Sequence, residues 1–311
     1  MADLILHHYP TSPFSEKVRL ILGHKGLAWK SVHIPRIMPK PDVLALTGGY
    51  RRTPFLQIGA DIHCDTALIA EVLDHHQPEP PLYPAHARGL SRVLAQWADG
   101  TLFWAAMGHN LSPKGAAALF AGQPPEAAAA FAADRGAMRT NMTVLRPTDA
   151  TSAYRSYLRR LSSMLDDQPF LLGEIPCIAD FAAYHPLWFS RVVNPAMAGV
   201  LDATPDVLEW MDRMAAIGHG RTEVMSSADA IALARSSTPA ALTDDIFRDD
   251  HGIALGSRVT VAPEAFGTEP TEGILRAATR TRYTLERTDE RAGTVHVHFP
   301  RVGFVLKEVK A

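Results

Sequence analysis

The sequence has 311 residues, 47% hydrophobic content and a formal net charge of -2. These values predict a globular protein with two or three domains and real hydrophobic cores. A near-neutral charge without a basic run excludes nucleic acid and anionic membranes as expected partners. The first residues lack the pattern of a signal peptide and no later stretch could span a bilayer, so we expect a cytoplasmic protein. Cys64 and Cys177 lack the spacing of a metal or redox motif, and we interpret both as reduced thiols.

The chain begins with a short apolar strand that leads into a helix. Residues 4–8 predict a buried strand, and residues 18–22 supply the apolar side of the helix. Ser12 stands at the helix start, with Pro13 at the first helical position, which favours Ser12 as the N-cap. A hydroxyl at a helix N-terminus also suits an anion or a thiolate, because free N–H groups and the helix dipole favour negative charge. On these residues alone, simple helix capping is the alternative to an active site.

A second strand and a hairpin follow. Residues 29–34 predict a short strand, and a proline-rich loop comes after it. Residues 51–66 contain two apolar runs around a Gly-Ala-Asp turn, which predicts a β-hairpin. A helix is expected over residues 67–73. Asp65 or Thr66 would cap this helix, and capping is the alternative to a binding role for both.

The order of these elements resembles the N-terminal domain of the glutathione transferase family. The resemblance rests on Ser12-Pro13-Phe14-Ser15 at a helix start, an X-Pro before a hairpin and Asp65-Thr66 at the next helix start. It covers the chain from Asp3 to about His76 and implies an α/β thioredoxin-like fold. The serine before Pro-Phe is most like the tau class and bacterial members. Ser15 matches the second cysteine position of a thioredoxin motif, so dithiol chemistry is excluded.

The resemblance implies a glutathione site on this domain. Ser12 is the expected catalytic residue, whose hydroxyl would hydrogen-bond the glutathione sulfur. Thr53, before a Pro54 that the resemblance implies is cis, would pair its backbone with the cysteinyl unit. The expected glutathione-binding residues are Lys40, Arg52, Thr53, Pro54, Asp65 and Thr66.

The ends of glutathione would meet charged and polar side chains. Asp65 and Thr66 stand where the family holds the γ-glutamyl group, and a carboxylate and a hydroxyl suit its ammonium and carboxylate. Arg52 stands near the place of the glycyl carboxylate, which an arginine can bind through two parallel N–H groups. Lys40 would assist it.

A helical domain follows a proline-rich linker over residues 77–84. Apolar residues then recur at helical spacing, and we expect an all-helical domain over residues 85–237. Cys177 and Asp180 resemble the family's Ser/Thr-x-x-Asp capping box, and we interpret both as folding residues, with Asp180 bonding N–H groups at the helix start. Side chains that could line a substrate pocket, with core packing as the alternative, are Tyr9, Phe14, Trp104 and Met107.

In the last stretch of the chain, the spacing of apolar residues changes from a helical period to alternation. From Gly256 onward, alternating apolar residues between glycine and proline turns predict strands, and we expect a small antiparallel β-barrel-like module over residues 238–311, as an appendage on the two domains of residues 1–76 and 85–237. His296 and His298 share one strand face, but two histidines without a third ligand do not predict a metal site, so no metal is expected. The module could bind a partner, cover the active site or extend a dimer contact.

The expected function is that of a glutathione transferase. Glutathione would be the co-substrate, a small apolar electrophile the second substrate, and the resemblance implies a homodimer. Two alternatives remain at this stage. One is a glutathione-binding or interaction protein with little turnover, and the other is a glutathione-dependent peroxidase or dehalogenase.

Overall fold

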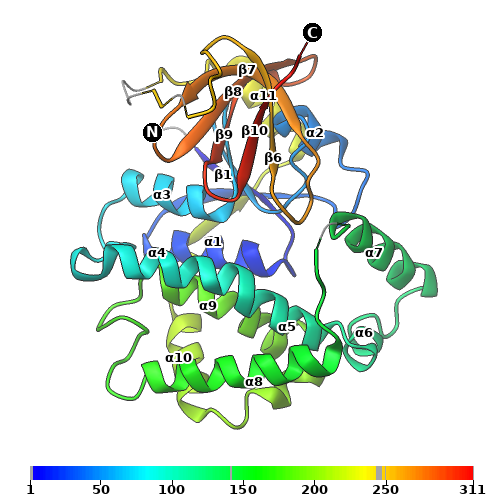
Figure 1. Ribbon diagram of the computed structural model, residues 1–311, viewed down its shortest axis with the longest axis vertical. Coiled ribbons are helices and arrows are strands. Elements are labelled where there is room, and N and C mark those ends of the chain that lie inside the picture. Colours follow the sequence, from blue (N-terminus) through cyan, green and yellow to red (C-terminus); the bar gives the residue numbers. More distant parts are fainter. Residues whose placement is uncertain (1–2, 141, 243–246, 249, 311) are drawn as a thin grey trace.

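A computed structural model describes residues 3–140, 142–242, 247–248 and 250–310. Figure 1 shows the strands gathered in its upper part and helices α4, α5, α8, α9 and α10 packed together below them. The strands are β1 (Leu4–His8), β2 (Ala28–His33), β3 (Phe55–Ile58), β4 (Asp61–Cys64), β5 (Arg221–Val224), β6 (Arg258–Pro263), β7 (Thr271–Ala278), β8 (Arg282–Asp289), β9 (Gly293–Pro300) and β10 (Phe304–Glu308). The α-helices are α1 (Pro13–His24), α2 (Pro41–Thr47), α3 (Thr66–His76), α4 (Arg88–Trp97), α5 (Phe103–Asn110), α6 (Pro113–Leu119), α7 (Pro125–Met138), α8 (Pro147–Met164), α9 (Ile178–Trp188), α10 (Pro205–Ala216) and α11 (Ser227–Ser236).

The N-terminal unit has the expected thioredoxin-like arrangement. Strand β1 pairs with β2 in parallel and with β3 antiparallel, and β3 forms the expected hairpin with β4. Side chains of a strand alternate between its faces. Leu4 and Leu6 of β1 therefore enter one hydrophobic core together with α1, α3 and the helical unit, whereas Ile5 enters a second core on the opposite face. The structure adds the short helix α2 after the proline-rich loop, with Pro41 at its first position.

The helical unit surrounds α9, every residue of which is buried. The interpretation of Asp180 as a folding residue is confirmed by its hydrogen bonds. Its carboxylate accepts from the backbone N–H of Cys177 at 2.9 Å, from that of Leu171 at 2.8 Å and from the indole N–H of Trp210 at 3.0 Å. No α-helix among the described residues is long and apolar enough to cross a membrane.

The end of the expected helical domain belongs with the N-terminal sheet. Strand β5 pairs in parallel with β2, in the register Ala28 to Arg221. Helix α11, expected from the sequence, packs against α2 and the sheet instead of the helical unit, and it buries Ile231 in the second core. The polypeptide therefore returns to the first domain after α10.

The C-terminal strands are present as expected and extend the same sheet. Among the described residues, the ten strands have the order β10-β6-β7-β8-β9-β4-β3-β1-β2-β5. The module curls so that Phe304 of β10 contacts Phe299 of β9, with ring centroids 5.6 Å apart. It does not close between β10 and β9, because β9 instead pairs in parallel with β4. The expected appendage is thus continuous with the N-terminal domain.

Candidate functional site

Ser12 lies at the turn between β1 and the N-terminus of α1. Its hydroxyl oxygen accepts a hydrogen bond from the Ser15 backbone N–H at 3.2 Å, so Ser12 is the N-cap of α1. The residue is buried, with 2% of its surface exposed. Among the described residues, no group accepts a hydrogen bond from this hydroxyl. An anion placed here would meet both that free donor and the N-terminus of α1.

Lys40 and Thr53 meet on the loops that precede α2 and β3. The Lys40 ammonium donates to the Thr53 hydroxyl at 3.4 Å, and the Thr53–Pro54 peptide bond is cis, as the resemblance implied. Burial, together with the smaller effects of the Arg135 and Arg51 charges, lowers the pKa of Lys40 to about 8 against the opposing effect of Asp134. Lys40 is therefore a buried cation that a ligand carboxylate would stabilise.

Asp65 and Thr66 lie side by side at the start of α3. Asp65 has a φ of 76°, the one positive value at a described non-glycine residue, and its carboxylate accepts from the backbone N–H of Ala67 at 3.0 Å. The Thr66 hydroxyl accepts from the ammonium of Lys17 at 3.2 Å. Asp65 thus caps α3, and both residues keep polar groups at its N-terminus, so capping by Asp65 is compatible with a binding role.

Arg52 is held by Asp65 and by the C-terminal module. One terminal guanidinium nitrogen of Arg52 lies 3.6 Å from an Asp65 carboxylate oxygen, and its Nε–H donates to the carbonyl of Phe266 at 2.6 Å. Its guanidinium also lies over the ring of Phe304, 5.6 Å from the centroid. The sequence left open whether the module covers the active site. These contacts place the β6–β7 loop against the residues expected to bind glutathione.

The aromatic candidates lie between the two domains. Phe14 packs on Phe103 and His185, with centroids 4.7 and 4.5 Å apart. Trp104 is partly exposed and contacts Phe266 of the β6–β7 loop at 5.1 Å. Met107 is instead buried in the first core.

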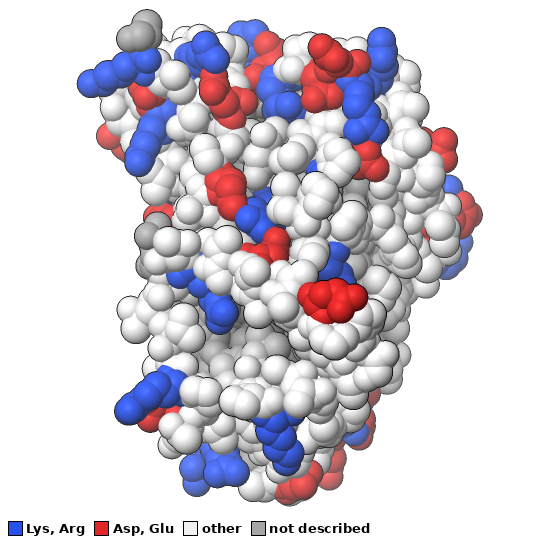
Figure 2. All heavy atoms as spheres, turned by 90° about the vertical axis from the view of Figure 1, so that its right-hand side faces the viewer, with Lys and Arg blue, Asp and Glu red and all other residues white. Residues whose placement is uncertain are grey.

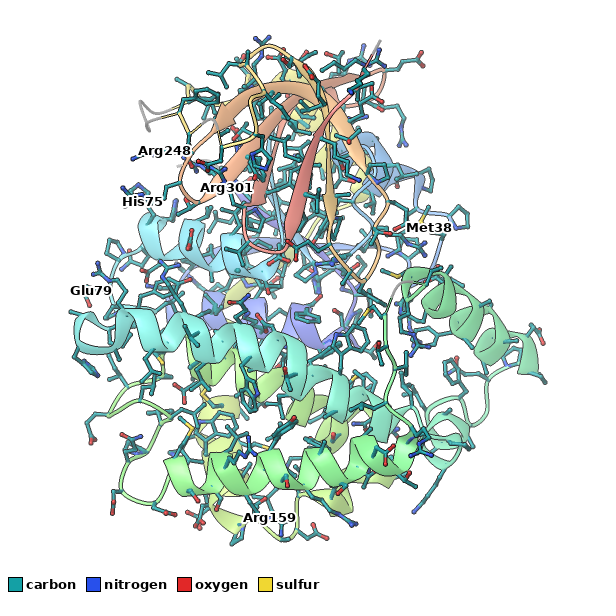
Figure 3. The ribbon with its side chains drawn as sticks, viewed as in Figure 1. Met38, His75, Glu79, Arg159, Arg248 and Arg301 are labelled. Atoms are coloured by element: carbon teal, nitrogen blue, oxygen red, sulfur yellow. The ribbon has the colours of Figure 1, made fainter. Side chains whose placement is uncertain are left out.

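Charged side chains of helix α7 contact the loops that carry the candidate site residues. The carboxylate of Asp134 pairs with Arg51 at 2.5 Å and accepts from the backbone N–H of Met38 at 3.2 Å. Figure 3 shows Met38 above α7. Arg135 donates to the Tyr9 hydroxyl at 3.4 Å, which connects α7 to the loop before Ser12. Figure 2, which faces the side that carries α6 and α7, shows a hollow in its lower half with few charges beside it.

A buried polar chain joins the candidate site to the helical unit. Lys17 of α1, besides its contact with Thr66, pairs with Asp99 at 2.5 Å, and Asp99 accepts from His185 of α9 at 3.0 Å. Sequence reasoning missed this chain, and it also missed Phe266 and Arg135. A charged Lys17 on the apolar side of its helix was an available signal, because a buried lysine requires a partner. Phe266 and Arg135 carried no such signal in the sequence.

The comparisons with known proteins agree with the two-domain fold. Family models described as glutathione S-transferase N-terminal domain and C-terminal domain match residues 6–81 and 87–213. A crystal structure of a GST-like protein from Pseudomonas syringae is 42% identical, with a TM-score of 0.82, over 99% of this chain and 100% of that chain. A glutathione S-transferase from Rhodospirillum rubrum F11 shares the fold, at 22% identity and a TM-score of 0.51 over 67% of this chain and 86% of its own.

A thioredoxin-like domain followed by a helical domain defines a class of two-domain proteins. This chain belongs to the glutathione S-transferase family. It is also similar to the protein named FtsZ-localized protein A of Caulobacter vibrioides, with 28% identity over 217 residues, 68% of this chain and 82% of that protein. The Pseudomonas syringae structure matches the C-terminal strands as well, because the match covers 99% of this chain.

Proposed function

We propose that this protein is a glutathione transferase that joins the thiolate of glutathione to a small apolar electrophile. The observation that carries this proposal is Ser12, a buried N-cap hydroxyl at the start of α1 whose hydrogen has no acceptor among the described residues. Membership of the glutathione S-transferase family supports glutathione as the co-substrate. Family resemblance further leads us to infer a cytoplasmic homodimer, and light scattering would test the dimer.

The charges around Ser12 suit the ends of glutathione. Asp65 and Thr66 would hold the ammonium and carboxylate of the γ-glutamyl unit, and the Thr53 backbone before Pro54 would pair with the cysteinyl unit. Lys40 and Arg52 are the cations for the glycyl carboxylate. Since Arg52 already contacts Asp65 and the Phe266 carbonyl, Lys40 has fewer competing partners. We therefore assign Lys40 the larger share of carboxylate binding.

Catalysis would combine a modest gain in thiolate with a large gain from proximity. A free thiol ionises near pH 8.5, and a hydrogen bond to a charged group contributes about 1.5 to 3 kcal/mol, which corresponds to about one to two pKa units. Nucleophilicity falls with pKa at a slope of about 0.4 to 0.5, which offsets much of that gain. Holding an apolar electrophile against the sulfur must supply the rest. Tyr9, Phe14, Trp104 and Phe266 are the side chains that could hold it.

Glutathione titration followed by calorimetry tests the proposal first. We expect binding in the micromolar-to-millimolar range and, from thiolate ultraviolet absorbance against pH, a bound thiol pKa below 8.5. A panel of alkyl halides, epoxides, activated alkenes and hydroperoxides then separates conjugation from dehalogenase and peroxidase activity. A protein that binds no glutathione at millimolar concentration contradicts the proposal.

Lys40 makes glutathione binding dependent on pH. Its pKa of about 8 lies below the usual 10.5, so it loses its positive charge above pH 8 in the free protein. A bound carboxylate favours the charged form, and affinity should therefore fall by up to about tenfold between pH 7 and 9. The measurement is calorimetry with S-methylglutathione, which has no thiol to titrate. The Lys40→Arg variant stays charged and is the matched control, so an equal loss of affinity in both proteins would assign the effect to the ligand.

An interaction protein with little turnover is the second candidate. It is supported by the similarity to a protein named for its location with FtsZ and by the β6–β7 loop against the site. Normal glutathione binding without turnover of any electrophile in the panel would favour this candidate. Deletion of the C-terminal strands is unsuitable as a test, because it would uncover the β4 edge that β9 pairs with.

A further inference from the structure

A cluster of two histidines and a carboxylate lies where the C-terminal strands join the N-terminal sheet. Asp61 is the first residue of β4, and His296 and His298 are on β9 beside it. Strand pairing places Asp61 opposite His296 and His63 opposite His298. Because residues two apart on a strand share a face, Asp61 and both β9 histidines point to the same side of the sheet.

The distances within the cluster suit one small ion. An Asp61 carboxylate oxygen lies 2.8 Å from His298 Nε2 and 3.8 Å from His296 Nδ1, and one ligand atom from each residue falls within 4.8 Å of the others. Ligands at about 2.0 to 2.2 Å from a tetrahedral ion lie roughly 3.3 Å apart. Side-chain rotations that move each ligand atom by less than about 1 Å would bring the three atoms to these separations.

Each ligand has a partner that orients it. His298 Nδ1 lies 2.9 Å from the hydroxyl of Thr284, and His296 Nε2 lies 3.7 Å from the carboxylate of Glu286. The second oxygen of Asp61 accepts from the backbone N–H of Ala240 at 2.8 Å. Metal-binding histidines usually direct their other ring nitrogen at such a group, which fixes the tautomer.

His296 has a ring nitrogen that the described fold leaves unsatisfied. Its side chain is 10% exposed, and its Nδ1 has no hydrogen-bond partner among the described residues. A buried polar atom of this kind normally has a partner, since losing one costs free energy. The His298–Asp61 contact could be an ordinary hydrogen bond, but that leaves the inward-facing nitrogen of His296 unsatisfied. A bound cation would satisfy it.

We propose that Asp61, His296 and His298 bind one divalent transition-metal ion of the zinc type. Two imidazole nitrogens and one carboxylate oxygen are a ligand set that such ions accept. On binding, His298 stays neutral while its proton moves from Nε2 to Nδ1, where it is donated to Thr284. This site is separate from the proposed glutathione site and does not depend on it.

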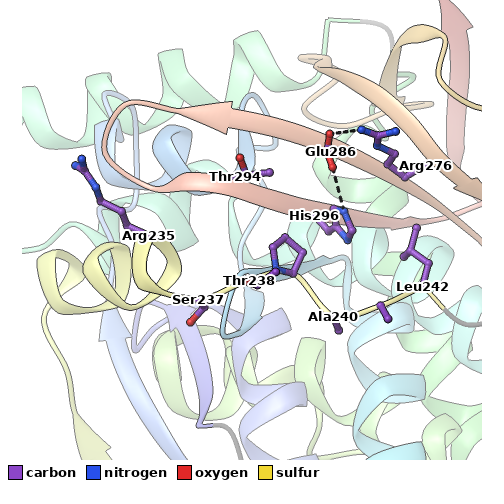
Figure 4. A pocket seen from close by; sticks show the side chains of 11 residues that line it. Arg235, Ser237, Thr238, Ala240, Leu242, Arg276, Glu286, Thr294 and His296 are labelled. Carbon is purple, nitrogen blue, oxygen red and sulfur yellow. Dashed lines mark hydrogen bonds and ion pairs between the residues drawn. The ribbon is translucent and has the colours of Figure 1, made fainter.

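The ion would fasten the C-terminal strands to the first domain and keep one coordination position open. Three protein ligands leave the fourth position of a tetrahedral ion for water or a ligand. Figure 4 shows His296 and Glu286 at a pocket between β9 and the chain after α11. This open pocket has a volume of about 640 Å³. Arg276 and Glu286 both line this pocket and form an ion pair, which holds the Glu286 carboxylate in place beside His296.

Zinc titration of the metal-stripped full-length protein tests the site. Glutathione must be left out, because its thiolate binds zinc. We expect one equivalent of Zn²⁺ to bind with a dissociation constant in the micromolar range or below, and Co²⁺ to give the visible absorption of a four-coordinate site. Zn²⁺ should also raise the melting temperature. The proposal is wrong if the wild-type protein binds neither ion.

Variants locate the bound ion. His296→Ala should weaken binding at least tenfold. It is expected to fold because His296 Nδ1 has no hydrogen-bond partner among the described residues and Glu286 keeps its pair with Arg276. Asp61→Asn keeps the shape of the side chain and provides the second variant, with circular dichroism to check folding. His251→Ala removes an exposed histidine of the same module and should bind zinc as the wild type does. Equal zinc affinity in all three variants would place the ion elsewhere and overturn the proposal.

Discussion

Replacing Ser12 by alanine is expected to raise the thiol pKa of bound glutathione by about one to two units. At neutral pH the rate of conjugation should fall by only about two- to fivefold, because the thiolate that does form is more nucleophilic. Above about pH 9 the thiol is ionised in both proteins, and the variant should be as fast as the wild type or faster. The measurement is the pH dependence of kcat, together with thiolate absorbance of the bound tripeptide.

Capping must be separated from thiolate stabilisation in this experiment. Ser12 accepts from the Ser15 N–H, so Ser12→Ala also removes a helix cap, at a cost of about 1 kcal/mol in stability. Ser12→Gly loses the hydroxyl with a loss of only a few tenths of a kcal/mol, and Ser12→Thr keeps both functions. Ser15→Ala is the matched control, since the Ser15 hydroxyl has no partner among the described residues. An unchanged thiol pKa in Ser12→Ala and Ser12→Gly would show that Ser12 does not stabilise the thiolate.

Replacing Asp99 by asparagine should lower the free energy of unfolding by about 3 kcal/mol. The side chain of Lys17 is 1% exposed, and Asp99 is its only anionic partner among the described residues. Burial acts to raise the pKa of Asp99, but Lys17 and then His185 outweigh it, so the pKa lies below its usual value. The stabilisation is therefore present above about pH 4 and lost only as the pH falls through that lowered pKa. Urea unfolding at pH 7 measures the loss.

A double-mutant cycle shows whether the buried charge is the cause. Lys17→Met removes the cation, and Asp99, whose side chain is 21% exposed, keeps contact with solvent and with His185. The double variant should therefore be more stable than Asp99→Asn alone. Asp149→Asn breaks the exposed pair with Arg146 and should change stability by less than about 1 kcal/mol. Equal losses at Asp99 and Asp149 would contradict the explanation.

The local elements of the fold could be predicted because local patterns specify them. Leu4 to His8, the Ser12-Pro13 start of α1 and the hairpin at Gly59 each carry their own signal of period, cap or turn. Asp180 was predicted in its capping role for the same reason. Helix α2 was missed, because its seven residues are too few to show a helical period.

The positions of the candidate site residues were predictable only in part. The cis Thr53–Pro54 bond followed from a resemblance carried by short motifs, whereas the residues themselves indicated Asp65 or Thr66 as the N-cap of α3. Their roles in binding glutathione remain predictions. Phe266 could not be placed from the sequence, since its contact with Arg52 joins residues 214 positions apart.

The sequence by itself determined the succession of strands and helices and the polar residues at their ends, since these depend on neighbours along the chain. Only the tertiary structure decided that β9 pairs with β4. An edge strand has free N–H and C=O groups, and the local sequence does not specify which strand will pair with them. That pairing makes the C-terminal strands part of the first domain. It also brings Asp61 to His296 and His298, so the two histidines acquire the third ligand that the sequence did not show.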